Sequence, residues 1–264
     1  MGNFEFKKMF GQNFLSDETL LEQIVDEAGV TKNDIVVEIG AGKGALTKFL
    51  SMKAKKVISF EIDRDLKDFL SEEFKDSNVE FVFDDVMKIS DDQINEMVSG
   101  KFKLVANLPY YVTSPIITRF LQNENLESLT VMVQEEVADR IIAKPKTKDY
   151  GVLTIMCGLF GETKKVIRVG REKFYPVPNV DSAVVRINKI ENSLEKNEMM
   201  AVINLAKKAF ANRRKKMSSN LESHNISKQK IEQLLVEKGF GESARAEELS
   251  INDFVWLYNE LKSC

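Results

Sequence analysis

Histidine is almost missing from this sequence, since His224 is the only one among 264 residues. This scarcity excludes catalytic triads that depend on histidine, histidine-rich zinc sites and an imidazole general base. His224 itself lies in a polar stretch, and we interpret it as a solvated surface residue without a role. Cysteine is nearly as rare: Cys157 and Cys264 offer neither a disulfide framework nor a thiolate metal site. We therefore expect a protein without a metal.

Long apolar runs are also missing. No stretch is long enough to cross a bilayer, and the first residues carry charges where a secretory signal needs an unbroken apolar run. We therefore expect a cytoplasmic protein that does not contact a membrane. An excess of basic residues is missing too, because the net charge is −3. Any nucleic-acid partner must then be bound by a local basic patch rather than by the charge of the whole chain.

The sequence does contain an alternation of β-branched runs and amphipathic stretches between residues 35 and 133. This rhythm predicts parallel strands joined by crossover helices. The expected strands cover residues 35–39, 57–61, 79–83, 103–106 and 129–133. Two further runs, 164–169 and 182–187, are separated by a proline-rich loop instead of a helix, which predicts an antiparallel hairpin at the sheet edge. The fold class is α/β. An antiparallel hairpin at the sheet edge is typical of a Rossmann-like methyltransferase sheet rather than of a dehydrogenase.

The strand signal ends near residue 189. Beyond it, apolar residues recur at helical spacing within 202–210, 231–235 and 254–261. We therefore expect a methyltransferase domain over residues 1–189 and a small all-α domain over residues 190–264. The polar stretch 191–197 is the expected linker between them.

A glycine-rich turn follows the first expected strand of the sheet. Gly40, Gly42 and Gly44 alternate there, and missing side chains let a ligand approach the backbone closely. The spacing differs from that of a pyrophosphate-binding loop, and Glu38 before the turn would face phosphate with a like charge. S-adenosylmethionine, which is cationic at its sulfur and amine, fits this turn better. The alternative is a tight strand-to-helix turn that binds nothing.

Carboxylates follow the next two strands. Glu61 comes about twenty residues after the first glycine, where it can accept hydrogen bonds from both ribose hydroxyls of the cofactor. Asp63 is interpreted as a helix N-cap instead. Asp85, favoured over Asp84, can accept the amino group of the cofactor's adenine while neighbouring apolar atoms cover the ring. Both aspartates could alternatively serve only as caps of the following helix.

The motif Asn107-Leu108-Pro109-Tyr110 follows the fourth strand at its carboxyl end, where ligands bind in open α/β sheets. An adenine N6 amine is a poor nucleophile, so a catalyst should accept its hydrogens and favour pyramidal nitrogen. The Asn107 side-chain oxygen can accept one hydrogen, and a backbone carbonyl of the turn, which we assign to Leu108, can accept the second. Pro109 would stiffen the turn, and Tyr110 would stack on the base. Asn107 is also expected to border the cofactor. In isolation, such a turn could simply end a strand.

With these elements together, the chain resembles the ribosomal RNA adenine dimethyltransferase family nearly from end to end. The resemblance is carried by the glycine turn, residues 60–63 and 107–110, and by three further motifs: Gly11-Gln12-Asn13-Phe14-Leu15, residues 133–140 and residues 174–183. It implies S-adenosylmethionine-dependent N6,N6-dimethylation of two adjacent adenosines near the 3′ end of small-subunit (16S) rRNA, coupled to maturation of the immature 30S particle. The resemblance also implies that Asn13 and Leu15 border the cofactor.

The resemblance further implies that Phe174 closes on the face of the target adenine opposite Tyr110; Phe174 could otherwise be a core residue. Ala41 and Lys43 look like the macrolide-resistance branch, which methylates large-subunit rRNA. Residues 107–111 and 143–151 look like the small-subunit branch, which we favour.

Two basic runs are the expected phosphate contacts of the RNA. They comprise Lys144, Lys146 and Lys148 near the pocket, and Lys207, Lys208, Arg213, Arg214, Lys215 and Lys216 beside the helical domain. Each run could instead be a solvated helix surface. A DNA adenine methyltransferase and a largely non-catalytic small-subunit assembly factor are the rival functions. We expect the protein to act as a monomer.

Overall fold

The computed structural model describes residues 14–223 and 226–262, so Asn13 and His224 lie outside the described residues. The chain divides into two compact units. Unit 1 comprises Met1–Ala138 and Glu162–Lys189, and unit 2 comprises Asp139–Gly161 and Ile190–Cys264. Residues 139–161 thus group with the C-terminal helices, although in the chain they come well before the expected boundary at residue 189. The assignment of separate functions to 1–189 and 190–264 stays a prediction.

Unit 1 is built on a seven-stranded sheet with the order β4-β3-β2-β5-β6-β9-β7. Neighbours from β4 to β6 pair in parallel, and β9 pairs antiparallel with β6. This confirms the mostly parallel sheet with an antiparallel edge. The strands are β2 (Ile35–Ile39), β3 (Lys56–Phe60), β4 (Val79–Val82), β5 (Phe102–Asn107), β6 (Leu126–Gln134), β7 (Gly161–Val169) and β9 (Ser182–Lys189).

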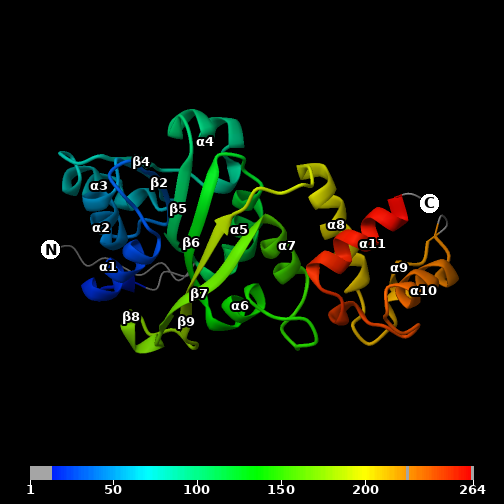
Figure 1. Ribbon diagram of the computed structural model, residues 1–264. Coiled ribbons are helices and arrows are strands. Elements are labelled where there is room, and N and C mark those ends of the chain that lie inside the picture. Colours follow the sequence, from blue (N-terminus) through cyan, green and yellow to red (C-terminus); the bar gives the residue numbers. More distant parts are fainter. Residues whose placement is uncertain (1–13, 224–225, 263–264) are drawn as a thin grey trace. The chain divides into compact units, whose positions relative to one another are not determined.

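Helices surround this sheet, as Figure 1 shows. The central strands are apolar on both faces, because Val36, Val37 and Leu104 are fully buried, which requires covering helices on both sides. One of these helices starts at a capping box, in which Ser90 and Gln93 bond to each other's backbone N–H groups. The helices of this unit are α1 (Glu18–Glu27), α2 (Ala45–Lys53), α3 (Lys67–Glu73), α4 (Asp91–Val98) and α5 (Thr113–Leu121), followed by α6 (Glu135–Ile141), which runs into unit 2.

A second, two-stranded sheet was not expected from the sequence. Strand β1 (Phe14–Leu15) pairs antiparallel with β8 (Phe174–Tyr175), so that Leu15 lies opposite Phe174. Both of these side chains belong to the main hydrophobic core of unit 1. The pairing therefore fixes the start of the described chain against the segment that precedes β9.

Unit 2 is helical. Its helices are α7 (Val152–Phe160), α8 (Lys196–Ala209), α9 (Met217–Leu221), α10 (Lys228–Glu237) and α11 (Ile251–Lys262). The expected helical character beyond residue 190 is confirmed, whereas α9, only five residues long, gave no periodic signal. Gly158 of α7 leaves room for the Ile251 side chain of α11, because a Cβ there would lie 2.3 Å from the Ile251 Cδ1 atom. The buried Tyr150 adds to this core, and its hydroxyl donates to the Leu249 carbonyl (2.8 Å).

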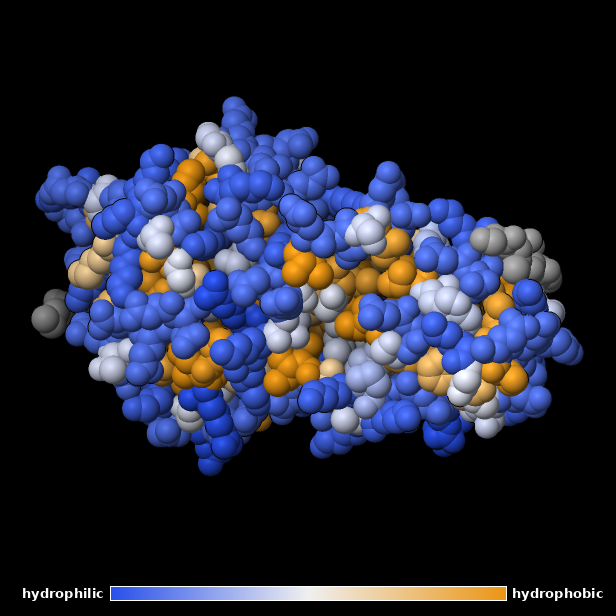
Figure 2. Space-filling model, in the orientation of Figure 1, coloured by the Kyte–Doolittle hydropathy of each residue, from blue (hydrophilic) through white to orange (hydrophobic). Residues whose placement is uncertain are grey.

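No helix within residues 14–223 and 226–262 is long and apolar enough to cross a membrane. Figure 2 shows hydrophilic residues over most of the visible face, with hydrophobic residues in smaller groups between them. No group of three or more His, Cys, Asp or Glu suited to a metal ion occurs in the same part of the chain.

Candidate active site

One pocket in unit 1 gathers nearly all the cofactor-binding and catalytic residues that the sequence analysis predicted. It lies where β2, β3, β4 and β5 end, at the carboxyl edge of the sheet. Asn13 cannot be placed, since it lies outside the described residues. The predicted site residues that line this pocket are Leu15, Gly40, Gly42, Glu61, Asp85, Asn107, Leu108, Pro109, Tyr110 and Phe174.

The glycine turn is shaped by backbone conformations that other residues rarely adopt. Gly40 and Gly44 have φ values of +81° and +79°. A Cβ on Gly44 would also lie 2.6 Å from the ring of Phe74. The Gly40 N–H donates to the Phe60 carbonyl (2.8 Å), which ties the turn to the end of β3. At Gly40 and Gly42 the turn thus presents backbone without a side chain to the pocket.

Glu61 holds this turn from the neighbouring strand. Its two carboxylate oxygens accept the N–H groups of Gly42 and Asp63, each at 2.8 Å. The residue is only 4% exposed, and burial raises the pKa of its carboxyl above the ordinary value. Each oxygen retains a lone pair, so a ribose hydroxyl could donate to either. Asp63 caps the 3₁₀ turn Arg64–Leu66 through the Asp65 N–H, as expected.

Glu38 does not reach the ligand side, contrary to the interpretation that it would face a bound phosphate. It does not line the pocket, and it is fully buried behind the turn. One of its oxygens accepts the hydroxyls of Thr47 and Ser59, both at 2.6 Å, and the other has no hydrogen-bond partner among the described residues. Burial raises the pKa of this carboxyl to about 7. The side chain points inward because α2 and β3 supply its hydroxyl partners.

Asp85 both lines the pocket and caps a turn. Its carboxylate accepts the Met87 N–H (3.0 Å) at the start of the 3₁₀ turn Val86–Lys88. Two apolar side chains at the pocket, Ile62 and Met87, are 43% and 39% exposed, which is high for such residues. They were missed in the sequence because nothing marks an apolar residue after an acidic one as a ligand contact. They offer apolar cover for a planar ring.

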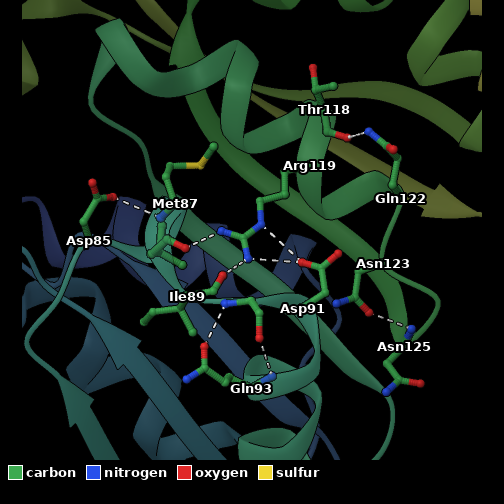
Figure 3. Close-up of polar contacts among 12 residues, drawn as sticks. Asp85, Met87, Ile89, Asp91, Gln93, Thr118, Arg119, Gln122, Asn123 and Asn125 are labelled. Atoms are coloured by element: carbon green, nitrogen blue, oxygen red, sulfur yellow. Dashed lines mark hydrogen bonds and ion pairs between the residues drawn. The ribbon is translucent and has the colours of Figure 1, made fainter.

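Arg119 of α5 clamps the turn that follows Asp85, as Figure 3 shows. Its guanidinium donates to the carbonyls of Val86 and Ile89 and to the carboxylate of Asp91, the last at 3.1 and 3.2 Å. Because α5 follows the Asn107 motif in the chain, the Arg119 side chain links the helix after that motif to the turn after Asp85, which lines the pocket.

We expect an Arg119→Met variant to bind the cofactor about tenfold more weakly, because two turn carbonyls and a carboxylate lose their donor. The rate of methyl transfer at saturating cofactor should change much less. Titration with S-adenosylhomocysteine and single-turnover kinetics would measure both quantities. Gln122→Ala is the matched control, since the Gln122 side chain, just after α5, donates to the Thr118 carbonyl of that helix and not to the turn after Asp85. An equal loss of affinity in both variants would contradict a specific role for the clamp.

The Asn107 motif presents free acceptors at the pocket. The Pro109 carbonyl is already occupied by the Val112 N–H and the Thr113 hydroxyl, both at 3.2 Å. The Leu108 N–H donates to the Met132 carbonyl (3.3 Å), but within the described part of the chain neither the Leu108 carbonyl nor the Asn107 side chain takes part in a hydrogen bond. These two groups can therefore accept the hydrogens of an amine that enters the pocket.

Aromatic side chains flank this motif. The Tyr110 hydroxyl bonds to the buried hydroxyl of Ser182 (2.8 Å) at the start of β9, and burial raises the pKa of the Tyr110 phenol. Phe174 lines the pocket while only 3% exposed, so it belongs to the core and to the pocket wall at once. Tyr111, which the sequence analysis did not single out, lines the pocket and is 59% exposed.

The expected RNA-binding residues all lie in unit 2 and all are exposed. Lys144, Lys146 and Lys148 occupy the loop before α7, whereas Lys207 and Lys208 end α8. The run from Arg213 to Lys216 lies between α8 and α9.

Comparisons with known proteins agree with this geometry. The model of the family described as ribosomal RNA adenine dimethylase matches residues 3–263. The ribosomal RNA small subunit methyltransferase A of Clostridium botulinum (strain Kyoto) is 42% identical over 256 residues, which are 95% of this chain and 92% of that protein. The protein of the same name from Bacillus licheniformis is 41% identical, over 98% of this chain and 92% of its own length.

Two solved structures share the fold of nearly the whole chain. A dimethyladenosine transferase from Plasmodium falciparum has a TM-score of 0.78 at 26% identity, over 95% of this chain and 98% of its own. The 23S rRNA methyltransferase ErmE has a TM-score of 0.75 at 28% identity, over 95% of this chain and 100% of its own. The family model extends over nearly the whole chain and over every residue that lines this pocket, so the chain belongs to the ribosomal RNA adenine dimethylase family.

Proposed function

We propose that this protein uses S-adenosylmethionine to dimethylate the N6 atoms of two adjacent adenosines near the 3′ end of small-subunit rRNA, as a step in maturation of the small ribosomal subunit. The observation that carries the proposal is the pair of open acceptors, the Asn107 side chain and the Leu108 carbonyl, in the same pocket as the glycine turn and Glu61. The names of the curated relatives support the small subunit as the substrate.

The pocket fits S-adenosylmethionine by the chemistry of its residues. Glu61 offers carboxylate oxygens for the ribose hydroxyls, and Asp85 offers one for the adenine amino group. Ile62, Val86 and Met87 supply apolar cover for the adenine ring. The bare surface at Gly40 and Gly42 admits the remainder of the cofactor close to the backbone. Leu15 closes the pocket from β1.

The protein's own groups would act on the target adenine. S-adenosylmethionine, when bound, supplies an electrophilic methyl group on a positively charged sulfur. Asn107 and Leu108 would accept the two N6 hydrogens, which draws the nitrogen toward a pyramidal shape and exposes its lone pair. Tyr110 and Phe174 would hold the base between them, with Ser182 fixing the Tyr110 ring. One N6–H is replaced in each round and its proton passes to water, so positioning rather than a strong base supplies the acceleration.

The RNA would be held by the exposed basic residues of unit 2, and the target adenosines must be unpaired or turned out of their stack to enter the pocket. A location in the cytoplasm and action as a monomer belong to the same proposal, and the ribosomal substrate supports the location.

We expect simultaneous replacement of Arg214, Lys215 and Lys216 by glutamine to weaken RNA binding and to flatten its salt dependence. Each phosphate contact on a single strand contributes a slope of about −0.7 in log K against log salt, so the slope should fall by about 2. Filter binding at several salt concentrations measures it. Cofactor affinity should not change, and an unaltered salt slope would refute the assignment of this run to RNA.

Mapping the modified nucleotides tests the function directly. The protein and radiolabelled S-adenosylmethionine are incubated with immature small subunits, with large-subunit RNA and with adenine-containing DNA. Two dimethylated, adjacent adenosines near the 3′ end of small-subunit rRNA are expected. Label in large-subunit RNA instead would favour the activity named for the 23S rRNA methyltransferase, which shares the fold. Label in DNA alone would replace the substrate class altogether.

A further inference from the structure

One of the basic residues expected to bind RNA is already engaged within the protein. The Arg213 guanidinium donates to the Glu247 carboxylate at 2.7 and 3.1 Å, and to the carbonyls of Lys148 (2.6 Å) and Thr147 (3.3 Å). Its charge also lies 5.9 Å from the ring centroid of Phe210. All three nitrogens of the Arg213 fork thus have protein acceptors, which leaves little of it for a phosphate.

The neighbouring basic side chains differ in this respect. Within the described residues, none of the other basic side chains of this set makes a hydrogen bond or ion pair. Arg214, the next residue, donates its backbone N–H to the Asn212 side chain (3.1 Å), which leaves its guanidinium free of protein partners there. These side chains are exposed and available to a ligand. The free set comprises Lys144, Lys146, Lys148, Lys207, Lys208, Arg214, Lys215 and Lys216.

Glu247 holds the loop of residues 144–148 by a second contact. Its backbone carbonyl accepts the Lys146 N–H at 2.7 Å. Lys146 has a φ of +68°, an uncommon conformation for a residue with a side chain, so the loop needs outside contacts to keep its shape. Inside the loop, the Thr147 hydroxyl and N–H both donate to the Lys144 carbonyl, at 2.7 and 3.3 Å.

The bridge brings two sequence-distant basic segments side by side. Residues 144–148 and residues 213–216 are about 65 positions apart in the chain, as the Arg213 to Lys148 bond records. Through Arg213 they become neighbours on the same unit. Each segment alone offers three free basic side chains, whereas together they offer a surface that can follow a phosphate backbone.

We propose that Arg213 and Glu247 act as a positioning pair, which fixes the 144–148 loop beside Arg214, Lys215 and Lys216 so that the two segments form one phosphate-binding surface for RNA. This inference rests on the proposed function. It gives Glu247, an acidic residue within a basic surface, the task of strengthening RNA binding.

Whether the loss of the Glu247 side chain weakens or tightens RNA binding distinguishes a positioning role from a simple effect of its negative charge. Removing an acid should tighten binding to RNA if only the net field matters, because a repulsive charge disappears. Removing a positioning residue should weaken it. We expect Glu247→Ala to bind a labelled RNA hairpin, with two adjacent adenosines in its loop, about tenfold more weakly at moderate salt. Glu247→Gln, which keeps an accepting oxygen, should fall between this variant and the unaltered protein.

The matched control is Glu242→Ala, which removes an exposed acid of the same unit whose side chain makes no hydrogen bond or ion pair with the described residues. Its RNA affinity should stay unchanged or rise slightly. Arg214→Gln should lower the salt slope by about 0.7, as one lost phosphate contact does, whereas Arg213→Gln should lower it by about 2, because the three loop lysines lose their placement. The cofactor affinity and melting temperature of each variant are measured alongside.

A Lys144→Gln, Lys146→Gln, Lys148→Gln background completes the test. In that background Glu247→Ala should have no further effect on RNA binding, since the loop has no charge left to position. Tighter binding of Glu247→Ala and Glu247→Gln in the unaltered background would overturn the positioning pair while leaving the RNA surface intact. Unchanged RNA binding by the triple lysine variant would also overturn the proposed role of the Arg213–Glu247 pair, because the loop would then not bind RNA. The proposed methylation activity would be unaffected by this result.

Discussion

Replacing Asn107 by alanine should lower the rate of methyl transfer by about 10² to 10³-fold, the usual effect of removing one preorganised group that acts on the transition state. Within the described residues, the Asn107 side chain and the Leu108 carbonyl are the open acceptors of this motif, since the Pro109 carbonyl is already occupied. Single-turnover kinetics at saturating cofactor and RNA measure the rate, and titration with S-adenosylhomocysteine measures cofactor affinity. The affinity should fall far less than the rate, because Glu61 and Asp85 remain.

An Asn107→Asp variant serves as the companion. It keeps an oxygen that can accept an N6 hydrogen, so it should retain more activity than the alanine variant. Binding to immature small subunits should be unaffected in both. If Asn107→Ala instead restored every function in cells that lack the native protein while transferring no methyl groups, the protein would act chiefly as an assembly factor and methylation would be incidental.

Glu61→Ala should weaken cofactor binding by about 10²-fold or more. Two hydrogen bonds to a charged acceptor, each contributing about 1.5 kcal/mol or more, would be lost from the ribose. The variant also leaves the N–H groups of Gly42 and Asp63 without their carboxylate, so the turn itself loses a support. Calorimetric titration with S-adenosylhomocysteine gives the affinity. Glu61→Gln should lose about tenfold, because it keeps one accepting oxygen.

The same carboxylate gives cofactor binding a pH dependence. Burial raises the pKa of Glu61, so the carboxylate takes up a proton at a higher pH than an exposed glutamate does. Only the ionised form can accept from both ribose hydroxyls and both backbone N–H groups. Affinity should therefore be full above the raised pKa and fall as the pH drops through it. The Glu61→Gln variant should lack this decline, and a decline of the same size in that variant would assign it to another group.

The strands of the sheet were predictable because each is a short β-branched run that can be recognised from its own residues. Each of the five expected parallel strands overlaps an observed one, with ends that differ by three residues or fewer. The β1–β8 pair was not predictable, since two strands of two residues carry no periodicity. The grouping of residues 139–161 with the C-terminal helices was missed for a different reason. Packing such as that of Gly158 against Ile251 depends on residues far apart in the chain.

The pocket residues were predictable where a motif marks them and not elsewhere. The predicted strands end at or next to Gly40, Glu61 and Asn107. Because these strands are parallel, their carboxyl ends bring the three residues together at one edge of the sheet. Arg119 gave no signal, because two of its partners are backbone carbonyls about 30 residues earlier in the chain. Arg213 was predicted to bind RNA from its charge alone, and only the structure shows that its guanidinium pairs with Glu247 within the protein.

The bond between Tyr110 and Ser182 has a consequence for synthesis of the protein. A nascent chain that has emerged only as far as Ala138 contains the glycine turn and the Asn107 motif, but the outer edge of β6 still lacks β9. At the usual rate of about 5–20 residues per second, several seconds pass before Ser182 follows. During that interval an unpaired strand edge is open to wrong partners. The ribosome must therefore deliver the last strand of unit 1 before the Tyr110 ring acquires its anchor.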